Sequence, residues 1–176
     1  MKKLFVGDLM YFYLQASLET YAGNGQKETI KALPGSKVYR YQKGGLLYVD
    51  CYFSEGEQSF GTIGIWYRDT PLWFMQYHGW CRRRGEKEII THLKKALLHN
   101  YENGVFFGGR GCRRWVDDKK KLEYRNEPTG SDEDFEDFQG KEAITKNSTE
   151  VFWHEYAGRL LFPVKRGLAD YIILPE

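Results

Sequence analysis

The stretch FGTIGIWYRDTPLWFMQYHGW, residues 60–80, resembles the stretch QGKEAITKNSTEVFWHEYAGR, residues 139–159, when the two are aligned without a gap. Five of the 21 aligned positions are identical; they pair Gly61 with Gly140, Ile65 with Ile144, Thr70 with Thr149, Tyr77 with Tyr156 and Gly79 with Gly158. The repeat predicts a strand, a turn and a second strand used twice, with glycine where the backbone must bend or approach closely.

A helical pattern precedes each copy of the repeat. Apolar residues recur at helical spacing over residues 9–16, where Asp8 is expected to be the N-cap and the glycines of 23–25 to end the helix. Residues 86–100 carry an apolar stripe with lysines on the other side, and Gly104 is the expected stop. The sequence therefore predicts two helices.

Further strands are expected between the helices and the repeats. Residues 38–41 and 46–53 flank a Lys-Gly-Gly turn and predict a hairpin. Residues 121–125 predict a strand that an acidic turn at 131–136 separates from the second repeat, and the apolar residues 171–174 predict a docked tail.

The order of these elements predicts the fold class. A helix followed by strands, occurring twice, is typical of an α+β domain with one antiparallel sheet and helices on one face. We expect a single domain over 1–176, built by duplication of halves at about 8–81 and 86–161. Under this hypothesis a pseudo-two-fold places Tyr77 and Tyr156 at equivalent positions on one face, with a ligand between them.

The composition limits the classes of partner. The chain has 176 residues, a net charge of +2 and an aromatic content of 16 %, so it can form a large aromatic core. Its three cysteines form no C-x-x-C pair, which favours a reduced, cytoplasmic protein. No apolar run is long enough for a signal sequence or a membrane span, so no membrane association is expected.

Neither a nucleic-acid partner nor a cofactor is expected. Basic residues cluster at 82–84, 110–114 and 119–121, but the acidic segment 132–137 interrupts a uniform positive field, and charge runs in connections are usually solvated. The sequence contains no phosphate-binding loop, dinucleotide-binding motif, zinc signature or G-x-S-x-G motif. We therefore predict no metal and no cofactor.

The alternation of side chains along each strand predicts a candidate site. One set is apolar and is assigned to the core under the helices; it consists of Leu47, Val49, Cys51, Phe53, Ile63, Ile65, Leu72 and Phe74. The opposite face carries the candidate ligand-binding residues Tyr48, Asp50, Trp66, Trp73, Tyr77, His154 and Tyr156. By this assignment Trp73→Ala costs less stability than Phe74→Ala.

Three uses of this aromatic face remain open. It can form a small-molecule pocket in which Asp50 and His154 orient the ligand by hydrogen bonding. It can be a second core under the loops 23–36 and 104–115, or the interface of a homodimer. An enzyme that uses Asp50 as acid or base, with His154 or Tyr77 beside it, is a further alternative. Glu142 and Glu155 are expected on the face opposite Asp50.

The chain resembles a bacterial family known as domain of unknown function 5680. The likeness lies in four segments in the expected order, namely 20–25, 48–52, 65–66 with 71–79, and 138–142 with 156–158. This family occurs alone or behind an N-terminal helix-turn-helix, which suggests a sensory role by analogy. The resemblance implies no established activity or catalytic residue. Where the family often has an acidic residue after its Phe-Gly element, this chain has Thr62, Ile63 and Gly64.

Overall fold

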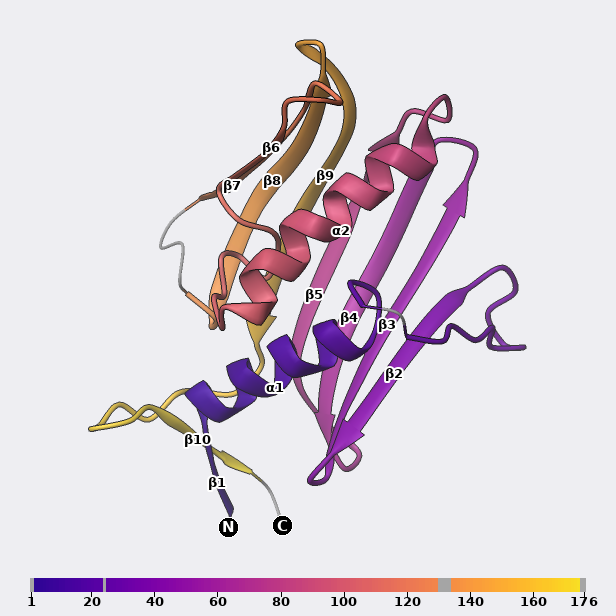
Figure 1. Ribbon diagram of the computed structural model, residues 1–176. Coiled ribbons are helices and arrows are strands. Elements are labelled where there is room, and N and C mark those ends of the chain that lie inside the picture. Colours follow the sequence, from indigo (N-terminus) through magenta and orange to yellow (C-terminus); the bar gives the residue numbers. More distant parts are fainter. Residues whose placement is uncertain (1, 24, 130–133, 175–176) are drawn as a thin grey trace.

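The computed structural model describes residues 2–23, 25–129 and 134–174. These residues form an eight-stranded antiparallel sheet, a two-stranded ribbon and two helices that lie on one face of the large sheet (Figure 1). The predicted α+β class is confirmed. The acidic turn expected at 131–136 lies partly outside the described residues.

The helices and strands follow one another in two similar series. The first series is α1 (Val6–Glu19), β2 (Lys37–Lys43), β3 (Leu46–Glu55), β4 (Gln58–Tyr67) and β5 (Thr70–Cys81). The second is α2 (Glu86–Glu102), β6 (Arg114–Asp117), β7 (Leu122–Thr129), β8 (Asp137–Lys146) and β9 (Thr149–Leu160). The predicted tail is strand β10 (Tyr171–Leu174), which pairs with β1 (Lys2–Phe5) in the small ribbon.

In the large sheet the four strands of each series lie in sequence order from the edge to the centre. The strand order is β2-β3-β4-β5-β9-β8-β7-β6, so the last strands of the two series meet in the middle. There Tyr77 of β5 pairs directly with Tyr156 of β9. The register shifts after Ile65 in the first hairpin and after Ile144 in the second, which are aligned positions of the repeat. This arrangement agrees with a pseudo-two-fold axis, and duplication stays a hypothesis about its origin.

The helix ends differ in part from the expectation. Helix α1 begins at Val6 with Phe5 at the N-cap, so the assignment of Asp8 as N-cap is wrong. Asp8 lies in the first turn, where a negative charge still interacts favourably with the helix dipole. Helix α2 spans Glu86–Glu102, and Gly104 follows it with a φ of 71°, a left-handed conformation that glycine adopts without strain.

On β3 the face that packs against the helices is opposite to the one expected, whereas Ile63 and Ile65 of β4 lie in the core as expected. Tyr48 and Asp50 are 1 % and 2 % exposed, whereas Leu47 and Val49 are only half-buried. The cross-strand partners of Tyr48 and Asp50 on β4 are Ile65 and Ile63, which therefore share this inner face. Trp73 and Met75 of β5 pair with Ile65 and Ile63, and Tyr77 lies on the same face. The assignment of Leu47, Val49, Cys51 and Phe53 to the helix-covered core was wrong.

Large rings also occupy the outer face, and this explains the error. Phe74 and Trp66 lie there in edge-to-face contact with ring centroids 5.0 Å apart. Trp66, unlike the other six candidate residues, therefore lies away from the helices. Trp73 is fully buried and Phe74 is half-buried. Trp73→Ala is therefore expected to cost more stability than Phe74→Ala, the reverse of the order expected from the sequence. Alternation along one strand does not show which face a helix covers. In addition, the register shift after Ile65 pairs Ile65 with Trp73, so Phe74 lies on the face opposite the isoleucines with which it was grouped.

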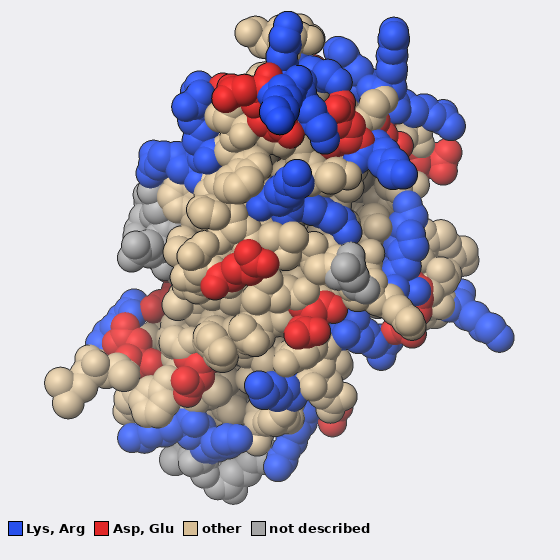
Figure 2. Space-filling view, in the orientation of Figure 1, with Lys and Arg blue, Asp and Glu red and all other residues tan. Residues whose placement is uncertain are grey.

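The helix-bearing face has an uneven distribution of charge. In Figure 2 lysine and arginine side chains gather in the upper part and along the right side of this face, with uncharged residues over much of its middle. In the described part of the chain, neither helix is long and apolar enough to cross a membrane.

Candidate functional site

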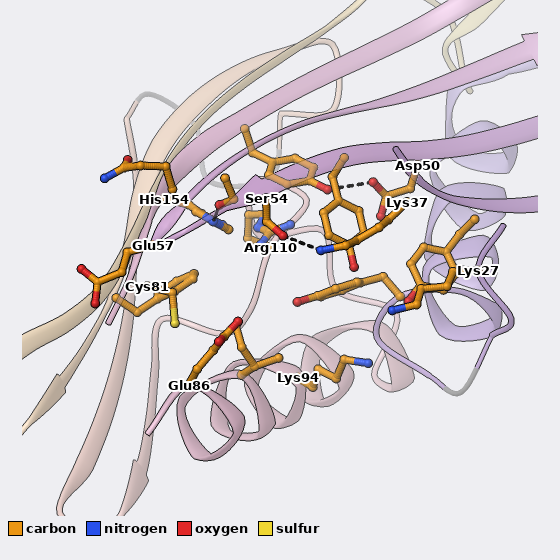
Figure 3. Close-up of a pocket in the computed structure, with 18 of the residues that line it drawn as sticks. Lys27, Lys37, Asp50, Ser54, Glu57, Cys81, Glu86, Lys94, Arg110 and His154 are labelled. Carbon is orange, nitrogen blue, oxygen red and sulfur yellow. Dashed lines mark hydrogen bonds between the residues drawn. The ribbon is translucent and has the colours of Figure 1, made fainter. Parts of the chain in front are cut away.

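A pocket of about 260 Å³ lies between α2 and the inner face of the sheet (Figure 3). Asp50 of β3, Tyr77 of β5 and His154 of β9 line it, so three of the seven predicted site residues meet at one cavity. Asp50 and His154 do not bond to each other, because the hydrogen bonds of His154 are made elsewhere.

The other four predicted residues do not line this pocket. Tyr48 and Trp73 are fully buried in the core. Trp66 is on the outer face, and the hydroxyl of Tyr156 donates a hydrogen bond to Asn126 Oδ1 at 2.7 Å. Thus the cavity is not centred between Tyr77 and Tyr156 but lies on the Tyr77 side. Tyr48 and Trp73 thus lie in the core, and a ligand in the cavity at Asp50, Tyr77 and His154 stays a prediction.

Asp50 is a buried carboxylic acid with a tyrosine as its hydrogen-bond partner. The hydroxyl of Tyr77 donates to Asp50 Oδ1 at 2.8 Å. Burial raises the pKa of Asp50 to about 6, although the Tyr77 hydrogen bond and the charge of Arg110 both act to lower it. The Tyr77 ring can reach across to Asp50 because it passes over Gly61, where a Cβ would come within 2.3 Å of the ring. Asp50 can therefore change charge near neutral pH.

A buried ion pair between Arg110 and Glu142 lies beside this acid. Arg110 Nε donates to Glu142 Oε1 at 2.9 Å, and Tyr124 donates to Oε2 at 2.7 Å. The positive charge of Arg110 and a hydrogen bond from His154 outweigh desolvation, so the pKa of Glu142 falls to about 2. Glu142 had been expected opposite Asp50, and Arg110 on a solvated connection; both expectations were wrong, because the two side chains are nearly inaccessible on the inner face. Glu155, in contrast, is exposed on the outer face.

His154 connects this ion pair to the pocket. Its Nδ1 lies 3.3 Å from Glu142 Oε1, and its Nε2 lies 2.9 Å from the hydroxyl of Ser59. Burial lowers the pKa of His154, and the hydrogen bond that His154 donates to Glu142 opposes this effect only in part. Ser59 was not among the residues that the sequence predicted at the site. For Glu142, a signal was available: the β8–β9 register pairs Glu142 with His154, which places both side chains on one face.

Three tyrosines form an aromatic wall at one end of the pocket. The rings of Tyr39 and Tyr52 are stacked with centroids 6.4 Å apart, and Tyr21 meets both edge-on at 6.1 Å and 5.9 Å. Burial raises the pKa of each hydroxyl, so all three are neutral at physiological pH. This wall offers flat apolar contact with polar tips.

Lysine side chains surround the same end. In Figure 3 Lys37 lies beside Asp50, Lys27 lies on the same side of the pocket and Lys94 faces them from α2, while Glu57, Cys81 and Glu86 lie with His154 toward the other end. Lys94 stands over the Tyr21 ring at 4.8 Å, and desolvation together with the charge of Lys27 lowers its pKa. Within the described residues, none of these three lysines forms an ion pair with a carboxylate.

Metal binding and catalysis by a cysteine thiol find less support in the described residues. They contain no group of three or more His, Cys, Asp or Glu side chains that could hold a metal ion. Cys81 lines the pocket, but burial raises its pKa to about 11, so its thiol is protonated at neutral pH and is a poor nucleophile.

The chain belongs to the family described as Domain of unknown function (DUF5680), whose model matches residues 50–161. The matched region begins at Asp50 and extends through β4, β5, α2 and all of β6–β9. It thus contains Tyr77, Arg110, Glu142 and His154, whereas Tyr21 and Tyr39 of the aromatic wall precede it. No curated protein and no solved structure matches the chain.

Proposed function

We propose that this protein binds a small anionic aromatic molecule in the pocket beneath α2, as a ligand-responsive domain of the cytoplasm. The observation that carries the proposal is the convergence of Lys27, Lys37 and Lys94 on an aromatic wall, without a carboxylate partner among the described residues. Neighbouring cations repel one another, and a bound anion relieves that repulsion.

The shape and chemistry of the pocket support this ligand class. A ring can lie against Tyr21, Tyr39 and Tyr52 while its acidic group meets the lysine ammonium groups. A volume of about 260 Å³ is below the usual range for drug-sized ligands, which favours one or two fused rings. Asp50 and Tyr77 near the lysines, and His154 at the other end, supply polar groups that can orient a substituent.

The sensory and cytoplasmic parts of the proposal rest on further observations. The resemblance to proteins that carry a DNA-binding helix-turn-helix supports a regulatory use of ligand binding. Cys51, Cys81 and Cys112 are free thiols, as is usual in a reducing compartment. Dimerisation stays an untested prediction, and the aromatic face proposed for it is covered by the helices of the same chain.

Isothermal titration calorimetry with three matched probes tests the charge preference. Naphthalene-2-carboxylate, 2-naphthylmethanol and 2-naphthylmethylammonium share one ring system and carry negative, zero and positive charge. We expect the carboxylate to bind at least about tenfold more tightly than the alcohol, because a charge-assisted hydrogen bond contributes about 1.5–3 kcal/mol. The ammonium compound should bind most weakly.

Two lysines on α2 provide the matched variants. Lys94 faces the pocket, whereas the adjacent Lys95 is exposed and does not line it. We expect Lys94→Met to reduce the preference for the carboxylate over the alcohol and Lys95→Met to preserve it. Equal affinity of the wild type for all three probes, or equal effects of the two variants, would contradict the proposal.

A further inference from the structure

Four residues form one row across the sheet at the His154 end of the pocket, and two of them, Ser59 and His154, line the pocket. Ser59 of β4 pairs with Gly79 of β5, Gly79 pairs with His154 of β9, and His154 pairs with Glu142 of β8. Directly paired residues of antiparallel strands point to the same face. Gly79 has no side chain, and a Cβ there would approach His154 Cδ2 to 2.7 Å. The glycine therefore leaves the space through which Ser59 and His154, two strands apart, reach each other.

The hydrogen bonds in this row fix the direction of proton donation. An ionised Glu142 can only accept, so the 3.3 Å contact with His154 requires the proton on Nδ1. Nε2 then has a free lone pair, which accepts the hydroxyl proton of Ser59 at 2.9 Å. The result is a hydroxyl, an imidazole and a carboxylate joined in the order that activates a serine nucleophile.

The surroundings hold each member in the required charge state. Arg110 and Tyr124 bind Glu142 and fix its two oxygens. Desolvation lowers the pKa of His154, which keeps the imidazole neutral and able to accept a proton at neutral pH. Ser59 is only partly buried, and both Ser59 and His154 line the cavity, so a bound molecule can reach the hydroxyl.

We propose that Ser59 is the nucleophile of an acyl-transfer site, with His154 as its general base and Glu142 as a positioning residue. The substrate class is an ester of a small phenol that carries an acidic group. This substrate class rests on the proposed function of the pocket, because the lysines at the other end would hold the acidic group. The nucleophile itself is independent of that function.

The reaction is an ester hydrolysis in two steps. Ser59 Oγ forms a bond to the ester carbonyl carbon while its proton moves to His154 Nε2. The bond from that carbon to the phenol oxygen then breaks, and the phenol leaves with the proton from Nε2. Water attacks the acyl-serine in the same manner, giving the carboxylic acid and restoring the serine hydroxyl. Arg110, a buried cation of the pocket, adds a positive field that favours the negatively charged intermediate.

Labelling with an alkyl fluorophosphonate tests the nucleophile without any requirement for ligand recognition. Ser59 Oγ attacks phosphorus, fluoride leaves and the hydroxyl proton passes to His154. We expect one adduct per chain, and fragmentation mass spectrometry should place it on Ser59 and not on Ser54, which also lines the pocket. Labelling should fall at least about 100-fold in Ser59→Ala and in His154→Gln, since general-base assistance contributes about 10²–10⁴.

Thr62→Ala is the matched control. Thr62 lies on the same strand as Ser59 but does not line the pocket that contains Ser59 and His154. This variant should be labelled at the wild-type rate. Because His154 must be neutral to act as a base, the labelling rate should rise with pH and level off before pH 7. Folded wild-type protein without an adduct, an adduct elsewhere, or undiminished labelling of the Ser59→Ala or His154→Gln variant would overturn the proposal.

Hydrolysis of 4-acetoxybenzoate then tests the substrate class. Its carboxylate suits the lysines and its acetyl ester suits Ser59. We expect release of 4-hydroxybenzoate at least about tenfold faster than release of phenol from phenyl acetate, by the charge-assisted contacts given above. Labelling at Ser59 without this preference would reject the substrate class and leave the nucleophile supported. Binding of naphthalene-2-carboxylate by a protein that is not labelled would instead reject the nucleophile alone.

Discussion

The two halves of the sheet place the same kind of hydrogen bond in different surroundings. In the first half Tyr77 donates to a carboxylate, Asp50; in the second half its partner Tyr156 donates to an amide, Asn126. Asp50 and Asn126 are equivalent, because they pair with Ile63 and Glu142, which the repeat aligns. The two halves thus hold equivalent hydrogen-bonded pairs, but only the Tyr77–Asp50 pair contains a carboxyl group that can ionise.

The difference lies in what covers each pair. The loop after α2 closes the second half, where the Asn126 amide donates to the carbonyls of Phe107 and Gly111. Gly108 in this loop is so close to Tyr156 that a Cβ would lie 2.7 Å from its hydroxyl. In the first half the equivalent space is the pocket at Asp50. The closed half therefore stabilises the fold, and the open half provides a cavity.

Removal of the Trp73 ring, which packs against residues of the second half, should lower the free energy of unfolding the most. Trp73 stacks on Phe135 and Phe138 of the second half, and its indole donates to the Phe135 carbonyl at 2.9 Å. We expect Trp73→Ala to lower the free energy of unfolding by about 3–5 kcal/mol. Phe74→Ala, a half-buried neighbour on the outer face, should cost about 1 kcal/mol. Urea denaturation measures both, and equal losses would contradict the assignment of the inner face.

Disruption of the buried Arg110–Glu142 ion pair should cost nearly as much stability. Glu142→Gln leaves the Arg110 charge without its counter-ion, and we expect a loss of about 3–5 kcal/mol in the free energy of unfolding. Glu123→Gln is the matched control, because Glu123 pairs with the exposed Arg114 and Arg125 and such pairs contribute about 0–1 kcal/mol. A small effect of Glu142→Gln would mean that Arg110 finds another partner or reaches water.

Asp50→Asn converts the ionisable pair into a copy of the other half. The pKa of Asp50 is raised from 3.8 to about 6, so the folded protein binds this proton more tightly than the unfolded chain. The stability that the protonated acid contributes is therefore present below pH 4 and lost as the pH rises through 6. Relative to wild type, the variant should gain about 2–3 kcal/mol between pH 4 and pH 7. A difference that does not change with pH in chemical denaturation would disprove this coupling.

The two repeat glycines provide the smallest expected difference. A Cβ at Gly61 meets only the ring of Tyr77 among its three nearest atoms, whereas a Cβ at Gly140 meets Tyr156 and also the carbonyl of Glu127 at 2.8 Å. Overpacking costs about 1–3 kcal/mol, and Tyr77 can move toward the cavity. Gly61→Ala should therefore be less destabilising than Gly140→Ala by about 1 kcal/mol in thermal denaturation. The reverse order would show that the first half is not the more adaptable one.

The sequence predicted several features because they depend on local patterns. The helices, the central hairpins and the α+β class follow from apolar periodicity and turn residues. The equivalence of Tyr77 and Tyr156 also came from the repeat, and both are paired at the centre of the sheet. Alternation grouped Asp50, Tyr77 and His154 on one face correctly, and these three line the pocket. Strands β6 and β1 were missed, because four residues carry too little periodicity.

Only the tertiary structure decided what that face contains. Both faces of the central strands carry large rings, so hydrophobicity alone did not indicate which one the helices cover. Arg110 lies in a connection that resembles a solvated basic run, yet it is buried because Glu142, 32 residues later, neutralises it. Ser59 and His154 are 95 residues apart and meet across a glycine on the strand between them. Such contacts depend on strand order and register, which join distant segments of the chain and leave no local pattern in the sequence.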